Sequence, residues 1–289
     1  MRILPVASVF ATLLLTACAS MPAASPASVA AQAPPPDDSL NATVWYQASV
    51  ERDLVYRAIY RAAGARLDTA LADKGWDALP NEDRDNDPRA LPPAIIVDVD
   101  ETVLDNSPTQ VRQILDHSGF NARDWGEWVE QRAAKPLPGA AEFLRAAAAK
   151  GVTVFYISNR DEEQAAATFD NLKSTGFPIN DSKQFLGAGM AVDGCDQKDN
   201  AKSCRRRLVG RRYRVLMQFG DQVGDFVRIA DNTRDGRREA IAPYLDWIGE
   251  RWWALPNPLY GSWESALFGK AQDQAARRAA KEAALDDAR

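Results

Sequence analysis

Histidine and cysteine are both scarce in this sequence, which argues against a histidine catalyst and against a metal site built from cysteines. The 289 residues include one histidine and three cysteines. The histidine, His117, is more typical of a surface or packing residue than of a catalyst. Neither Cys195 nor Cys204 has a second nearby cysteine in a Cys-x-x-Cys arrangement, which argues against a metal site there. In an oxidising compartment this pair can form a disulfide, with two free thiols as the alternative.

The chain also lacks a strong charge of either sign. Its 35 basic and 40 acidic residues give a formal net charge of -5, so there is no reason to expect a nucleic-acid polymer as a partner. We interpret the basic run Arg205-Arg206-Arg207 as a solvated helix face. The apolar run from Ile3 to Leu15 is too short for a comfortable transmembrane helix but fits the hydrophobic region of a signal peptide.

The N-terminal segment predicts a lipid anchor. Leu15-Thr16-Ala17-Cys18 resembles a bacterial lipobox, in which small residues precede a cysteine that becomes acylated. We expect a lipoprotein signal peptide over residues 1–17, lipidation at Cys18 and a flexible Ala- and Pro-rich tether over residues 18–40. An ordinary signal peptide is the alternative. The predicted location is the bacterial cell envelope, at the outer membrane and facing the periplasm or the surface.

The rest of the chain predicts one α/β domain over residues 41–269. Apolar runs at 94–99, 152–157 and 214–219, with a weaker one at 226–229, are typical of buried strands separated by helices. This alternation predicts a Rossmann-like, doubly wound and mainly parallel sheet. Between 42 and 74, helical spacing predicts one or two helices that bury Val44, Ala48, Leu54, Ala58, Ala62 and Leu67.

Two further segments are set apart from this core. Residues 103–138 are long for a connection, which predicts a small helical cap insertion over the active site. Residues 140–150, closed by Gly151, predict a helix of the main fold. The charged tail, residues 270–289, is expected to form a frayed helix in solvent.

Polar residues follow three of the predicted strands. Asp98 and Asp100 close the first, Ser158-Asn159-Arg160 close the second, and Asp221 and Asp225 follow the third. In an open α/β sheet ligands bind at the carboxyl ends of the strands, so these side chains should meet. Clustered carboxylates repel one another unless a cation lies among them, and oxygen ligands suit Mg²⁺.

The motifs resemble those of a known family. Asp-x-Asp-x-Thr over 98–102, then Ser158, a lysine and Gly-Asp-x-x-x-Asp over 220–225 form the signature of the haloacid dehalogenase (HAD)-like phosphatases. Residues 97–107 and 156–160, with Leu255-Pro256-Asn257-Pro258-Leu259-Tyr260-Gly261-Ser262-Trp263-Glu264, look like bacterial class C acid phosphatases, which include lipoprotein 5′-nucleotidases. This closer resemblance covers roughly residues 42–268.

The resemblance implies a HAD fold and a Mg²⁺-dependent acid phosphatase. Asp98 would attack phosphorus to form a phosphoaspartate, and Asp100 would act as the acid and base. The side chain of Asp98, the main-chain carbonyl of Asp100, Asp221 and Asp225 would hold Mg²⁺. The phosphate would be bound by Thr102, Ser158, Asn159, Arg160 and Lys202, with Lys198 as the alternative lysine. Gln222 departs from the asparagine that the family often has there.

The substrate and the exact reaction stay open at the level of sequence. A small phosphomonoester, preferably a 5′-nucleotide, is the expected substrate, and its base would stack on aromatic side chains. Transfer of the phosphoryl group to an alcohol is one alternative, because Asp100 would serve both reactions. A non-enzymatic surface-binding lipoprotein is the other. The candidate stacking residues are Trp125, Trp128, Tyr260 and Trp263.

Overall fold

The computed structural model describes residues 39–195, 201–271 and 273–288. The signal peptide, Cys18, almost all of the tether and Lys198 lie outside these ranges. Among the described residues, no helix combines the length and the apolar character needed to cross a bilayer.

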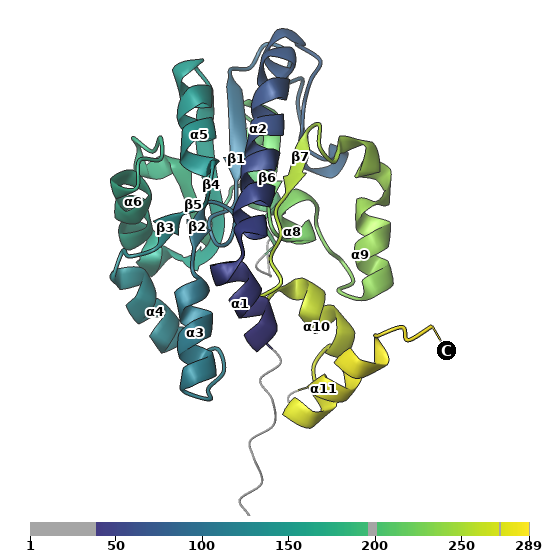
Figure 1. Ribbon diagram of the computed structural model, residues 1–289. Helices are drawn as coiled ribbons and strands as arrows, with labels where there is room; N and C mark the ends of the chain where they lie inside the picture. The colour runs from purple at the N-terminus through teal and green to yellow at the C-terminus, as the bar shows by residue number, and fades with distance from the viewer. Residues whose placement is uncertain (1–38, 196–200, 272, 289) are drawn as a thin grey trace, which may run out of the picture. The chain divides into compact units, whose positions relative to one another are not determined.

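A five-stranded parallel sheet forms the centre of the domain, with the strand order β5-β4-β1-β6-β7 (Figure 1). The predicted strands at 94–99, 152–157 and 214–219 are present, and they occupy the three central positions. They are β1 (Pro93–Val97), β4 (Thr153–Asp161) and β6 (Arg214–Gly220). The doubly wound, mainly parallel α/β fold is therefore confirmed.

The edges of the sheet differ from the prediction. The segment 226–229 is not a strand, because Val223–Phe226 forms a short helix, α8, directly after the β6 loop. The edge strands are β5 (Phe185–Ala188) and β7 (Trp252–Ala254), which the sequence analysis missed. Both are four residues or shorter, so neither carries enough periodicity to stand out in a sequence.

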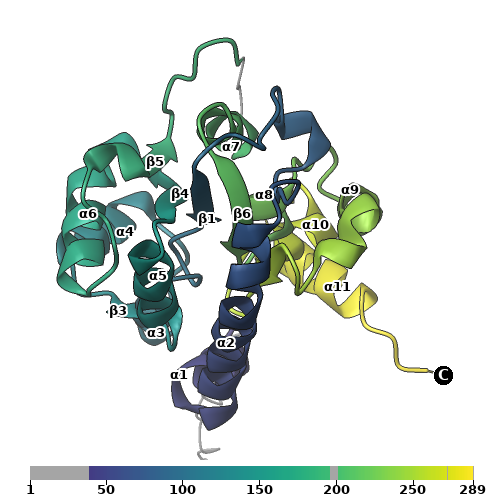
Figure 2. The same ribbon diagram turned by 90° about the horizontal axis from the view of Figure 1, so that it is seen from above.

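Helices cover both faces of the sheet (Figure 2). Ile95 and Val97 of β1 point into one hydrophobic cluster with α2 (Val50–Ala72) and α5 (Ala140–Ala149), the latter helix as predicted. Ala94 and Ile96 point into the other cluster, which includes Val209 of α7 (Ser203–Gly210). This alternation is what a strand buried on both faces produces.

The predicted N-terminal helices exist as α1 (Leu40–Ala48) and α2, but the predicted buried stripe is wrong. Val44 and Leu54 are 54% and 59% exposed, and only Leu67 of the predicted set is buried. The buried line instead runs through Tyr46, Tyr56 and Tyr60. Their hydroxyls find partners in the fold; that of Tyr60, for example, donates to the Thr102 carbonyl at 2.7 Å. A tyrosine is easily buried when such a partner exists, and the sequence does not show the partner.

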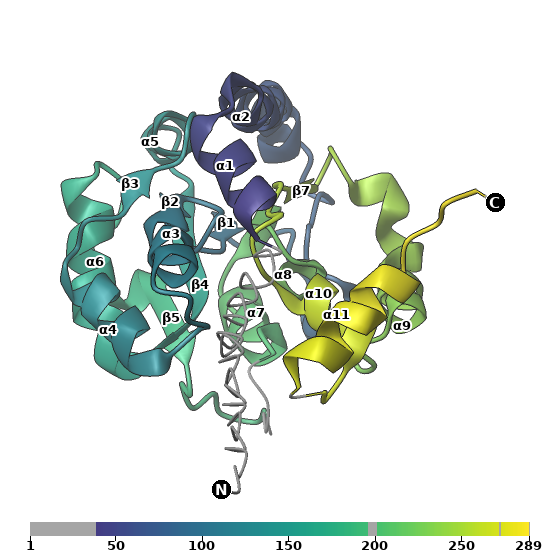
Figure 3. The ribbon, with the colours of Figure 1, turned by 60° about the horizontal axis from the view of Figure 1, so that its bottom comes forward.

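The segment 103–138 contains two helices and a two-stranded antiparallel ribbon. These elements are β2 (Leu104–Asp105), α3 (Ser107–Leu115), α4 (Ala122–Glu130) and β3 (Lys135–Pro136). Figures 1 and 3 place α3 and α4 at the end of the sheet where β1 leads into β2, which is the end formed by the carboxyl termini of the strands.

The charged tail forms helix α11 (Gln274–Ala283), which packs on α10 (Ser262–Phe268) rather than standing free. Lys281 and Glu264 form an ion pair of 2.6 Å between the two helices. The guanidinium of Arg277 lies 5.0 Å from the centre of the Phe268 ring. The remaining elements are α6 (Ala165–Ser174), α9 (Arg234–Ile241) and the 3-10 turns Asn81–Asp83, Glu162–Gln164, Ser182–Gln184 and Ala242–Trp247.

Candidate active site

Asp98 is the first residue after β1, and its backbone is still part of the sheet. Its N–H donates to the Phe219 carbonyl of β6 at 2.9 Å. The chain then turns sharply, with Glu101 at φ 57° and hydrogen bonds from Val103 and Leu104 back to Val99. This turn buries Asp98 at the carboxyl edge of the sheet, with 6% of its surface exposed.

Three carboxylates meet at this edge. Asp221 follows β6, and Asp225 lies in α8. One carboxylate oxygen from each of Asp98, Asp221 and Asp225 lies within 4.8 Å of the other two. The glycine at 220 is required here, because a Cβ on Gly220 would lie 2.3 Å from the Asp225 side chain. A cluster of hard oxygen ligands around one point fits a divalent cation such as Mg²⁺.

Lys202 supplies the positive charge of this cluster. Its ammonium group forms ion pairs with Asp98 and, at 2.7 Å, with Asp225. Burial acts to lower the pKa of Lys202, but the charges of Asp225 and Asp98 outweigh it, so the pKa is raised and the group stays charged. The sequence left Lys198 open as an alternative; Lys202 is the lysine that the described residues bring to Asp98.

Burial and mutual repulsion raise the pKa values of two of these carboxylates, those of Asp98 and Asp221. Burial raises the pKa of Asp98 well above its usual value, and Lys202 opposes this shift. Burial, with the nearby charge of Asp225, raises the pKa of Asp221 to about 6, and hydrogen bonds from Gln222 and Asn257 limit the rise. One ammonium group therefore does not fully compensate the three carboxylates, which is a second sign that the site fits an added cation.

Asp100 is held by three neighbours. The guanidinium of Arg160 contacts it through Nη2 at 2.8 Å and Nε at 3.0 Å, and Asn106 Nδ2 donates to the same oxygen at 2.8 Å. Ser158 Oγ lies 3.3 Å from the other oxygen. The carboxylate is thus fixed beside Asp98 while it remains partly open to solvent.

Arg160 does not fit the phosphate-binding role that the sequence analysis gave it. Only 2% of the residue is exposed, and its third nitrogen, Nη1, donates to Thr168 Oγ1 at 3.0 Å. All of its nitrogens thus contact protein acceptors, and the residue orients Asp100. The sequence does not show these contacts, because Asp100, Asn106 and Thr168 come from the turn after β1, the segment before α3 and helix α6.

The other predicted phosphate ligands lie around the cluster. Thr102 Oγ1 contacts Asp98 Oδ2 at 3.0 Å, and Ser158 lies against Asp100, so both hydroxyls border the site. Asn159 is exposed, and its side-chain oxygen accepts from Arg205 Nη2 at 2.8 Å. Its amide oxygen is therefore turned toward α7.

The basic run Arg205-Arg206-Arg207 is not a solvated helix face. Arg205 and Arg206 are almost fully buried in α7. Arg205 donates to the Ser158 carbonyl at the end of β4, and Arg206 donates to the carbonyls of Gly224 and Asp225, at 3.1 Å in both cases. Helix α7 therefore contacts both β4 and α8, which a helical pattern in the sequence does not reveal.

A disulfide joins Cys195 and Cys204, as the sequence analysis expected for an oxidising compartment. Cys204 lies in the first turn of α7, two residues after Lys202, and is buried. The bond therefore fixes the start of the helix that carries the lysine.

The four aromatic candidates have different surroundings. Trp128 is buried, and its Nε1 donates to Asn106 Oδ1 at 2.8 Å, so the prediction of an accessible stacking surface is wrong for this residue. Trp125 is half-buried beneath the Arg160 guanidinium, 5.4 Å from the ring centre. Tyr260 is half-buried and donates to Glu101, whereas Trp263 is 38% exposed.

Sequence reasoning missed three polar residues of the site. Asn106 holds Asp100, Asn257 Nδ2 donates to Asp221 Oδ2 at 2.8 Å, and the buried carboxylate of Glu101 accepts from the Asn106 N–H at 2.6 Å. Burial raises the pKa of Glu101 well above its usual value. Asn106 and Asn257 lie within the motifs that carried the family resemblance, and this position in the motifs could have identified them as site residues.

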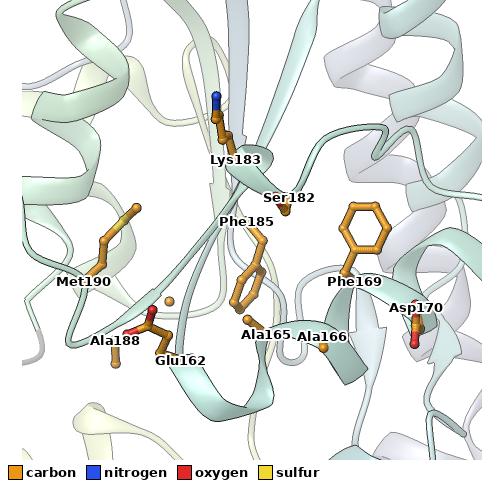
Figure 4. Close-up of a pocket in the computed structure, with 11 residues that line it drawn as sticks. Glu162, Ala165, Ala166, Phe169, Asp170, Ser182, Lys183, Phe185, Ala188 and Met190 are labelled. Atoms are coloured by element: carbon orange, nitrogen blue, oxygen red, sulfur yellow. The ribbon is translucent and has the colours of Figure 1, made fainter.

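A separate pocket of about 520 Å³ lies between α6 and the edge strand β5 (Figure 4). Figure 4 shows Phe169 and Phe185 facing this space, with Lys183 and Glu162 toward its ends. None of the predicted site residues lines it.

An acidic cluster with one lysine at the carboxyl edge of a parallel sheet fits the HAD-like class that the motifs predicted. A family model described as "HAD superfamily, subfamily IIIB (Acid phosphatase)" matches residues 7–263. The chain therefore belongs to this family of phosphomonoesterases.

Solved structures and curated proteins agree with this assignment. The class C acid phosphatase from Bacillus anthracis, solved with tungstate bound, is 32% identical, with a TM-score of 0.74 over 86% of this chain and 96% of that one. Acid phosphatase 1 of Solanum lycopersicum is 25% identical over 165 residues, and the stem 31 kDa glycoprotein of Glycine max is 26% identical over 165 residues. The matches span 57% and 58% of the length of these two relatives.

Proposed function

We propose that this protein is a Mg²⁺-dependent acid phosphatase that hydrolyses small phosphomonoesters through a phosphoaspartate on Asp98. The observation that carries the proposal is the position of Asp98, buried between Lys202 and the carboxylates of Asp221 and Asp225, with Asp100 fixed beside it by Arg160. Phosphoryl transfer needs a positioned nucleophile and positive charge around the phosphoryl oxygens, and this arrangement provides both.

The reaction proceeds in two displacements. In the first, an Asp98 oxygen forms a bond to phosphorus while the bond to the ester oxygen breaks, and Asp100 donates a proton to the departing alcohol. In the second, water attacks the phosphoaspartate, its proton passes to Asp100, and Asp98 and inorganic phosphate separate. Mg²⁺, held by Asp98, Asp221, Asp225 and the Asp100 carbonyl, would neutralise negative charge on the phosphoryl oxygens.

The phosphoryl group would be bound by Lys202 and by the hydroxyls of Thr102 and Ser158. Tungstate is a tetrahedral oxyanion like phosphate, and the Bacillus anthracis relative is described with it bound. An oxyanion at the carboxyl edge of the sheet would lie among these donors. Asn159 would contribute through its exposed amide, whereas Arg160 acts on Asp100.

We further propose that 5′-nucleotides are preferred and that the protein is attached to the outer membrane through a lipid on Cys18. Trp125, Tyr260 and Trp263 are the aromatic side chains left for a nucleobase, since Trp128 is buried. The lipobox supports the anchor. Palmitate labelling of the full chain in bacteria, beside Cys18→Ala, tests this part; labelling that survives the substitution would rule out Cys18 as the anchor.

Release of inorganic phosphate tests the activity. A form beginning at residue 19 would be given 5′-AMP, 3′-AMP, nicotinamide mononucleotide and p-nitrophenyl phosphate, with Mg²⁺ or with EDTA. We expect Mg²⁺-dependent release that is fastest with 5′-nucleotides and falls to background in Asp98→Asn. Adding an alcohol acceptor and measuring its phosphorylation separates hydrolysis from transfer. A folded wild-type protein that releases phosphate from none of the four would overturn the proposal and favour a binding role.

A further inference from the structure

The two oxygens of Asp221 have different surroundings. Oδ2 accepts two amide hydrogen bonds, from Gln222 Nε2 at 2.7 Å and from Asn257 Nδ2 at 2.8 Å. Oδ1 has one long contact, from Thr102 Oγ1 at 3.4 Å. Two donors on one oxygen fix the rotation of the carboxylate. The Thr102 hydroxyl that contacts Oδ1 also contacts Asp98 Oδ2, so Oδ1 lies on the side of Asp98.

Gln222 contacts the second carboxylate through its main chain. Its N–H donates to Asp225 Oδ2 at 2.8 Å, while Asp225 Oδ1 pairs with Lys202. A single residue therefore supports both aspartates that follow β6, one through the side chain and one through the backbone. Helix α8 begins immediately after it, so the two contacts are fixed relative to each other.

The amide of Gln222 is itself held by the chain segment before α10. Its oxygen accepts from the Ser262 N–H at 3.1 Å and the Ser262 hydroxyl at 3.2 Å, and Nε2 also lies 3.4 Å from the Tyr260 carbonyl. Both the nitrogen and the oxygen of the Gln222 amide are thus held by hydrogen bonds to other residues. An asparagine is one methylene shorter, so its amide would lie farther from Ser262 than that of Gln222 does.

Gly261 provides the space that this longer amide needs. Its φ of 151° and ψ of 176° lie in a region open essentially to glycine alone. A Cβ at this position would lie 2.3 Å from Gln222 Nε2 and 2.5 Å from Oε1. The glycine at 261 and the glutamine at 222 therefore fit each other.

We propose that Gln222, which packs on Gly261 and is held by Ser262, is the positioning residue of the metal site and leaves Oδ1 as the oxygen of Asp221 that would bind the cation. The inference rests on the proposed Mg²⁺ dependence. Gln222 acts through its hydrogen bonds to Asp221 and Asp225. Supporting contacts of this kind commonly change metal affinity about 10- to 100-fold when they are removed.

Titration calorimetry with Mg²⁺ tests the inference without using activity. Gln222→Met keeps the length of the side chain and removes the amide. Gly261→Ala leaves Gln222 in place but adds a methyl group that would collide with its amide. We expect each to raise the Kd for Mg²⁺ about 10- to 100-fold. The Mg²⁺ concentration for half-maximal activity should rise by the same factor. Gln274→Ala at the exposed start of α11 is the matched control and should keep the wild-type Kd.

Thermal unfolding of the metal-free proteins separates misfolding from a local effect. The inference requires Gln222→Met to unfold cooperatively and still to bind Mg²⁺ weakly. It is overturned if Gln222→Met and Gly261→Ala both bind Mg²⁺ within twofold of wild type. If the wild-type protein itself binds no Mg²⁺, the proposed metal dependence fails first, so the two failures are distinguishable.

Discussion

Asp100 shows how much a catalytic role depends on neighbours that the motif does not name. Its carboxylate is fixed by Arg160 and Asn106, and Asn106 is fixed in turn by Trp128 Nε1 and by the buried Glu101. A general acid must present its proton in one direction, and this chain of hydrogen bonds sets that direction. The contacts of Arg160 therefore lead to a prediction that distinguishes orientation from phosphate binding.

Substitution of Arg160 by lysine should lower kcat with little change in KM. One ammonium group cannot replace contacts to Asp100, Asn106 and Thr168 that leave from different nitrogens. We expect a loss on the order of 10²-fold in kcat, the lower part of the range for a misplaced acid or base. Steady-state kinetics with p-nitrophenyl phosphate measures both constants. A raised KM with an unchanged kcat would instead return Arg160 to the phosphate site.

At the scale of elements, α7 connects the loops of the site. Lys202 precedes its first residue, Arg205 contacts the Ser158 carbonyl of β4, and Arg206 contacts the Asp225 carbonyl of α8. Arg206 also forms a buried ion pair with Asp83, with 2.6 Å between Nε and Oδ2. Two arginines can be buried in such a short helix because Arg205 and Arg206 both meet hydrogen-bond acceptors.

Replacing Arg206 by methionine should destabilise the protein by about 3–5 kcal/mol, because Asp83 is left buried without a partner. Burial already raises the pKa of Asp83, and Arg206 opposes that rise. Because the pKa of Asp83 is higher in the folded than in the unfolded protein, its protonated form favours folding. This contribution is complete below the unfolded-state pKa of about 4 and is lost as the pH rises through the folded-state pKa. Without Arg206 the folded-state pKa of Asp83 rises further. The loss of unfolding free energy in Arg206→Met should therefore be larger at pH 8 than at pH 5.

Urea unfolding of wild type and Arg206→Met at the two pH values measures this change. The double variant Asp83→Asn with Arg206→Met should regain part of the lost stability and most of the wild-type pH dependence. Equal deficits at pH 5 and pH 8 would contradict the role assigned to the pair.

The disulfide leads to a second prediction for this element. Replacing both Cys195 and Cys204 by serine should cost about 2–3 kcal/mol, the chain-entropy value for a loop of this length. Because Cys204 lies two residues after Lys202, kcat/KM should also fall. A phosphine reductant should have the same two effects on the wild type. It should leave the double variant unchanged, and a reductant effect on that variant would mean that another cause is at work.

At the scale of the whole molecule, the proposed cation site carries more negative charge than its one lysine neutralises. Three carboxylates, of which those of Asp98 and Asp225 are buried, face one ammonium group, and the pKa values of Asp98 and Asp221 are raised. A cation that binds only the folded state stabilises the entire domain by mass action.

Mg²⁺ at about 100 times its Kd should stabilise the domain by about 2.7 kcal/mol. For a domain of this size that corresponds to a rise of roughly 5–10 °C in Tm. Differential scanning calorimetry with Mg²⁺ and with EDTA measures it. Asp221→Asn should unfold at a higher temperature than wild type in EDTA, because repulsion is relieved, and should gain less from Mg²⁺. A wild-type Tm that is the same in both conditions would count against the metal site.

The residue sequence by itself determined the centre of the sheet and the chemistry at its edge. The strands β1, β4 and β6 are long apolar runs of the kind that burial on both faces requires, and Asp98, Ser158 and Asp221 lie at or just beyond their apolar stretches. Parallel strands bring their carboxyl ends to one edge, so this order in the chain was sufficient to predict the meeting of Asp98, Ser158 and Asp221. Lys202 was indicated by the family resemblance alone.

The tertiary structure alone decided which side chains are free to act. Tyr60 is buried because the Thr102 carbonyl accepts its hydroxyl, and Arg206 is buried because Asp83 and two carbonyls meet it. Arg160 turns to Asp100, and Gln222 reaches Ser262 over Gly261. A polar side chain takes its place from partners distant in sequence, and only the folded chain brings those partners within hydrogen-bonding distance.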